Sequence, residues 1–125
     1  MRKLEKHEAQ EYFKLLEPAK AKVLLELRKR LVKLSGAENE LIISYQLPTL
    51  RVSGKNFLAF AGWKDFYSIY LLSGSLGKSL AKKLTQGELD KSVIRFSWHE
   101  KVSDETLMLI ISAKQKELAA RAKAR

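Results

Sequence analysis

The spacing of apolar residues changes once early in the chain, and this change constrains the fold more than any other feature. Between Pro18 and Leu34 apolar residues recur at steps of three and four, which is typical of one face of an α-helix. From Leu41 to Leu47 they alternate with a period of two, which is typical of a β-strand. The chain is therefore expected to combine a long helix with a sheet.

Local signals predict where the helices begin and end. A short amphipathic helix is expected over residues 8–16, followed by a long helix that starts near Pro18, where the missing N–H of proline is tolerated. Gly36 favours the left-handed conformation that ends such a helix. A third helix is expected over about 75–84. Ser103 is a good N-cap for the last one.

Alternating segments separated by turn residues predict the strands. They are expected at 41–47, 49–52, 56–61, 66–71 and 92–98. Pro48 is expected to stop or bend the first strand, because proline cannot donate to a sheet ladder. Residues 85–90 are expected to form a polar loop. The order of elements predicts an α+β fold in which helices pack on one side of an antiparallel sheet.

Composition limits the classes of function. The 125 residues fit a single domain over 1–125, with frayed ends at about 1–7 and 120–125. The absence of cysteine excludes a disulfide framework and a thiolate metal site. No apolar run approaches the ~20 residues of a membrane span, and no secretory core follows the first residues, so a cytoplasmic protein without a membrane partner is expected. The net charge of +10 favours anionic partners, or serves only to solvate the surface.

Two motifs and two later segments together suggest a relationship. Residues 44–50 read Ser-Tyr-Gln-Leu-Pro-Thr-Leu, and residues 54–56 read Gly-Lys-Asn. A strand preceded by Lys64 and an Ile-Arg-Phe segment at 94–96 follow. In this order the chain resembles the YdhG-like family, a domain of unknown function, over roughly 12–118. The resemblance implies a curved antiparallel sheet, and some members of that family are described as frataxin-like iron chaperones.

The same regions contain the candidate ligand-binding residues. Arg95 on a strand would be a rigid, permanently charged fork for an anion. Lys64 and the Tyr45 hydroxyl are predicted to converge on it, with Lys55 and Gln46 near the mouth of the site. Gln46 stands where the family usually has glycine, and a side chain there could close the predicted pocket.

Other interpretations of these residues remain open. Arg95 could instead sit at the rim of the sheet and pair with a carboxylate such as Glu40 or Glu88. The aromatic residues of the strands could stack nucleic-acid bases, or they could pack in the core. Residues 77–79 read Gly-Lys-Ser, but Leu72 stands where a phosphate-binding loop needs glycine, so a capped helical turn is favoured.

The sequence predicts a non-catalytic binding module that holds an anionic small molecule or an acidic segment of a partner protein in a concavity of its sheet. A nucleic-acid-binding protein that uses a basic surface is the first alternative. A frataxin-like iron chaperone is the second, implied by the resemblance alone. His7 and His99 lack the close spacing of metal ligands, so no metal site and no cofactor are predicted. The sequence contains no set of residues that is typical of a catalytic site.

Overall fold

The structure, a computed structural model, describes residues 3–36 and 38–123. The elements follow in the order α1 (Ala9–Lys14), α2 (Pro18–Ser35), β1 (Asn39–Ser44), β2 (Leu47–Val52), β3 (Lys55–Gly62), β4 (Phe66–Tyr70), α3 (Gly74–Leu80), β5 (Glu88–Asp90), β6 (Val93–Ser97) and α4 (Asp104–Lys123). The predicted fraying falls partly on residues 1–2 and 124–125, which lie outside the described residues.

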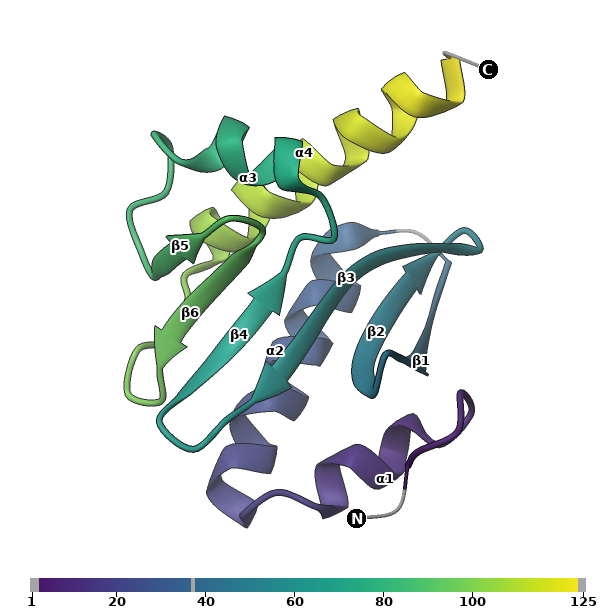
Figure 1. Cartoon of the computed structure of the whole chain (residues 1–125), viewed down its shortest axis with the longest axis vertical. Coiled ribbons are helices and arrows are strands. Elements are labelled where there is room, and N and C mark those ends of the chain that lie inside the picture. Colours follow the sequence, from purple (N-terminus) through teal and green to yellow (C-terminus); the bar gives the residue numbers. More distant parts are fainter. Residues whose placement is uncertain (1–2, 37, 124–125) are drawn as a thin grey trace.

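The strands form one antiparallel sheet of six strands in the order β1-β2-β3-β4-β6-β5. Figure 1 shows α2 behind the strands, while the opposite face of the sheet carries no helix. The covered face contributes alternate residues to the main core, among them Leu58, Phe60 and Ile69. These residues pack with apolar residues of all four helices. The predicted α+β fold, with helices on one side of a curved sheet, is confirmed.

The predicted start and end of α2 and the predicted N-cap of α4 are confirmed. Pro18 opens α2, and Gly36 ends it with a left-handed φ of 66°. The Oγ of Ser103 accepts a hydrogen bond from the N–H of Thr106 at 3.1 Å, as an N-cap residue does. The helices predicted over 8–16 and 75–84 are shorter in the structure, where α1 covers Ala9–Lys14 and α3 covers Gly74–Leu80.

The first predicted strand is wrong beyond Ser44. Tyr45 and Gln46 instead form a two-residue turn between β1 and β2, with φ values of 52° and 63°. Two successive left-handed residues match the twist of a hairpin, but Asn-Gly is the usual sequence for such a turn. The alternating pattern of the sequence continues through the turn, and no typical turn residue marks it. Tyr45 is 96% exposed and does not share the face of a strand.

Pro48 lies inside β2, although the sequence predicted that it would stop or bend a strand. It faces Ile43 of β1, whose N–H donates outward to the carbonyl of Lys6 at 2.9 Å. Ile43 and Pro48 are thus a pair without mutual hydrogen bonds, and the missing N–H of Pro48 points toward β3. The ladder between β2 and β3 begins only at Thr49, so no hydrogen bond is lost there.

Two further details of the sheet differ from the expectation. The loop predicted over 85–90 contains β5, a strand of three residues that is too short to show a period. A bulge between β2 and β3 places Phe57 and Leu58 in succession in the core, because Arg51 pairs with Asn56 while Leu50 pairs with Leu58. None of the helices in the described part of the chain is long and apolar enough to cross a membrane.

Candidate functional site

The structure does not bring the three leading candidate residues together. Tyr45 lies in the turn between β1 and β2, and Arg95 lies on β6, which is three strand positions from β2 and four from β1. At about 4.8 Å per strand this separation is roughly 14–19 Å, which is too far for one small ligand. Lys64 is exposed in the turn between β3 and β4. A ligand-binding role for each of them stays a prediction.

Arg95 occupies the rim position that was the alternative interpretation. One of its terminal nitrogens lies 3.5 Å from a carboxylate oxygen of Asp90, and its guanidinium lies 5.6 Å from the centre of the Phe66 ring. The partner is therefore neither Glu40 nor Glu88. Glu40 pairs with Arg51 at 3.5 Å, on β1 and β2 at the other edge of the sheet. Arg95 is partly exposed, so this pair contributes little to stability.

Gln46 and Lys55 also have definite positions. The side-chain amide of Gln46 accepts from the N–H of Leu4 at 2.9 Å and donates to the carbonyl of Leu4 at 3.0 Å. Gln46 thus ties the N-terminal segment to the turn between β1 and β2. Lys55 is exposed at the start of β3. The pairing by Gln46 depends on a contact 42 residues away in sequence, which no local pattern encodes.

A groove on the open face of the sheet is the best candidate site. It encloses about 400 Å³ and is lined by Ser44, Tyr45, Leu47, Thr49, Asn56, Ala59, Leu72, Lys114 and Arg121. The turn between β1 and β2 and the C-terminal end of α4 lie at opposite ends of the strands (Figure 1). The groove therefore runs along β2. Thr49 and Ala59 face each other across β2 and β3. Because both side chains are small, they leave space at the base of the groove.

Lys114 is the residue that sequence reasoning missed. It is not among the predicted site residues, and its side chain is only 1% exposed. Its Nζ donates to the carbonyl of Leu71 at 2.7 Å and lies 3.8 Å from an oxygen of Glu117. Burial lowers the pKa of Lys114, and the Glu117 carboxylate opposes this shift. The only sequence feature that could have indicated its burial was the place of Lys114 on an amphipathic helix.

The charges around Lys114 are unequal. Glu117 lies 3.0 Å from a terminal nitrogen of Arg121 and accepts a hydrogen bond from Ser73 at 2.6 Å. Two cations therefore share one carboxylate. Glu117 lines a different hollow, between α3 and α4, whereas Lys114 and Arg121 line the groove. The groove consequently has an excess of positive charge at its α4 end.

The backbone of the groove is strained at two places. Tyr45 and Leu72 both have positive φ, at 52° and 60°, although neither is glycine. This conformation costs an ordinary residue about 1–2 kcal/mol. Strained residues persist only where the surrounding structure holds them in place, and they are common at functional sites. Both residues are exposed, so their side chains are accessible to a ligand.

The described residues contain no group of three or more His, Cys, Asp or Glu side chains that could hold a metal ion. Nothing in the groove resembles a base and nucleophile pair. Its polar groups are a phenol, a serine and a threonine hydroxyl, an amide and two cations, which are groups suited to binding an anion.

Comparison with solved structures identifies the fold. The crystal structure of YdhG, a protein of the DUF1801 family from Bacillus subtilis, superimposes with a TM-score of 0.76 at 15% sequence identity. The alignment covers 88% of this chain and 90% of that one. No family model matches the sequence, and no curated protein matches it either. The likeness confirms that this chain has the fold of a YdhG-like domain, as its motifs predicted.

Proposed function

We propose that the protein is a non-catalytic binding module whose open-face groove holds an anion: a small molecule that carries carboxylate or phosphate groups, or an acidic segment of a partner protein. The proposal rests on one observation. Lys114 and Arg121 reach the groove, while Glu117, the carboxylate that they share, lines another hollow. A negative group in the groove would complete the pairing of the two cations.

The environment of Lys114 strengthens the attraction. A charge that is almost fully buried interacts with a ligand through a medium of lower effective dielectric than water. Arg121, which is 56% exposed, would meet the ligand at the rim and adds a planar fork that fits carboxylate or phosphate. The proposed module acts in the cytoplasm, where phosphorylated and carboxylated metabolites are abundant.

The proposal is tested by thermal unfolding in the presence of citrate, inorganic phosphate or a tetraglutamate peptide at constant ionic strength. A ligand at ten times its dissociation constant stabilises the folded state by about 1.4 kcal/mol. For a domain of this size the melting temperature should rise by roughly 4–6 °C. The two small anions and the peptide distinguish a metabolite from an acidic protein segment as the bound species.

A matched pair of variants locates the site. Arg121→Gln removes a cation that lines the groove, whereas Lys123→Gln removes one from the same helix that does not line it. Arg121→Gln should weaken binding about fivefold or more, and Lys123→Gln should leave it unchanged. If both variants weaken binding equally, the overall charge is responsible and the groove proposal fails.

Nucleic-acid binding is the second candidate function, and two exposed aromatic residues favour it. Tyr45 is 96% exposed and Trp63 is 46% exposed, on a protein with a net charge of +10. Exposed rings can stack on bases while lysines and arginines contact phosphates. Affinity for a short single-stranded RNA should then fall steeply with salt, and Trp63→Ala should reduce it. No specific feature of the described residues favours the iron-chaperone alternative.

A further inference from the structure

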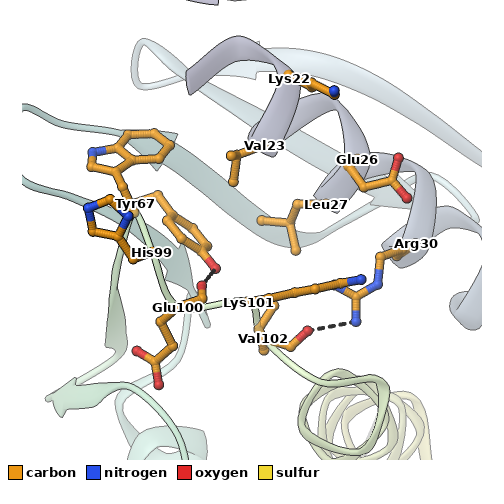
Figure 2. A pocket seen from close by; sticks show the side chains of 11 residues that line it. Lys22, Val23, Glu26, Leu27, Arg30, Tyr67, His99, Glu100, Lys101 and Val102 are labelled. Atoms are coloured by element: carbon orange, nitrogen blue, oxygen red, sulfur yellow. Dashed lines mark hydrogen bonds between the residues drawn. The ribbon is translucent and has the colours of Figure 1, made fainter. Parts of the chain in front are cut away.

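A second hollow lies on the covered side of the sheet, between α2 and the segment that joins β6 to α4. It encloses about 300 Å³, and its apolar lining comes from Val23, Leu27, Tyr67, Trp98 and Val102. In Figure 2, Val23 and Leu27 point from α2 across open space toward the ring of Tyr67. The interior of this hollow is therefore apolar, and it is large enough for a small ring.

The aromatic wall is fixed before any ligand arrives. The indole N–H of Trp98 donates to the carbonyl of Trp63 at 2.9 Å, and its ring lies 5.3 Å from that of Tyr67. The Tyr67 hydroxyl donates to the carbonyl of Glu100. A Cβ atom at Gly62 would come within 2.9 Å of the Trp98 ring, so this position requires a glycine. A preformed wall reduces the ordering that binding would otherwise require.

Three cations, Lys22, Arg30 and Lys101, and two carboxylates, Glu26 and Glu100, line the hollow. Figure 2 shows the carboxylates of Glu26 and Glu100 directed away from the space between Leu27 and Tyr67, whereas the Lys101 side chain extends toward Arg30. Arg30 already has partners, since it donates to the carbonyl of Val102 at 2.7 Å and forms an ion pair with Asp104. Within residues 3–36 and 38–123 no carboxylate forms a direct ion pair with Lys101, although Asp104 lies near enough for the two charges to interact. Lys101 is therefore more available to a ligand than Arg30, which already has two partners.

We propose that this hollow is a second ligand site, which takes a small organic acid with an apolar ring. The ring would lie between Val23, Leu27 and Tyr67, and Lys101 would hold the carboxylate. Neither an apolar molecule alone nor a hydrophilic anion alone would use both halves of the site. The site lies on the opposite side of the sheet from the groove and does not depend on the function proposed above.

Tryptophan fluorescence offers a direct measurement with 3-phenylpropanoate as the probe. The chain has two tryptophans, and in a Trp63→Phe background Trp98 in the wall of the hollow is the sole reporter. The substitution keeps the backbone carbonyl that accepts from Trp98. We expect a saturable change in emission with 3-phenylpropanoate. The uncharged isostere 3-phenylpropan-1-ol should bind about fivefold more weakly, because it lacks the charge that Lys101 would meet.

Two pairs of variants separate the contributions of the ring and the charge. Val23→Phe fills the hollow and should weaken binding of the acid by about tenfold or more, whereas Leu25→Phe on an exposed part of the same helix should not. Lys101→Gln should weaken binding of the acid about fivefold and leave binding of the alcohol unchanged. Lys29→Gln, on an exposed part of α2, is its control.

Each outcome bears on the proposal. Equal affinities for the acid and the alcohol in the Trp63→Phe protein would overturn the assignment of Lys101 as the anion contact. Unchanged binding by Val23→Phe, with circular dichroism showing a folded protein, would overturn the location of the site. The Lys101→Gln result is independent of the core, so the proposal remains falsifiable even if Val23→Phe fails to fold.

Discussion

Replacing Lys114 with methionine should change how the stability of the protein depends on pH. The side chain is 1% exposed, and burial lowers its pKa from the ordinary value of 10.5. Methionine keeps the unbranched apolar stem and removes the charge. The wild type therefore buries a cation near neutral pH that the variant does not.

The sign of the effect follows from where the proton is held. Below the lowered pKa of the folded protein, Lys114 is protonated in both the folded and the unfolded states, and it adds no pH dependence. Between that value and 10.5, the unfolded chain keeps a proton that the folded protein has released. The free energy of unfolding of the wild type, relative to Lys114→Met, should therefore rise with pH through this window. The slope can reach about 1.4 kcal/mol per pH unit.

Urea denaturation at several pH values from neutral up to 10.5 measures this slope. Lys116→Met removes the same charge from an exposed position two residues along the helix. This control should follow the pH dependence of the wild type. If the difference between the wild type and Lys114→Met is flat or falls with pH, the argument that Lys114 is a buried and desolvated cation is refuted. Citrate in the groove should hold the proton on Lys114 and reduce the slope.

Two further predictions concern close contacts. Gly77→Ala should lower the free energy of unfolding by about 1–3 kcal/mol or more, because the new Cβ would lie 1.9 Å from the carbonyl oxygen of Lys91. Gly74→Ala in the same helix meets nothing within 4 Å and should be neutral or slightly stabilising in urea denaturation; equal stabilities of the two variants would contradict this contact. Gln46→Ala removes two hydrogen bonds to Leu4 and should cost about 0.5–1.5 kcal/mol, with faster amide exchange at Leu4 by NMR. Unchanged exchange there would show that the amide of Gln46 does not hold this segment.

The sequence predicted those parts of the fold whose cause is local. The long helix, its proline start and its glycine end depend on neighbouring residues, and α2 has the expected bounds. The turn at Tyr45 and Gln46 could not be predicted, because neither residue is a common choice for left-handed φ. Tertiary packing holds the turn instead, through the bonds between Gln46 and Leu4.

The candidate site was predicted less well, because charge and burial are set by packing. Lys114 is one of many lysines in the sequence, and only the passage of α4 beside Leu71 buries it. Tyr45 lines the groove, but Arg95 lies on a distant strand, so the predicted grouping of the two around one ligand does not form. The resemblance to YdhG-like sequences predicted the fold correctly and could not show which residues share a pocket.

The hydrogen bond from Ile43 to Lys6 has a consequence for the behaviour of the protein at high concentration. An open edge strand invites the edge of a second molecule to pair with it, which leads to aggregation. On β1 the N-terminal segment already accepts from the Ile43 N–H. At the other edge, β5 offers only three residues. Both edges of the sheet are thus poor templates for strand addition, so the segment from Leu4 to Lys6 hinders polymerisation and also supports the β1–β2 turn.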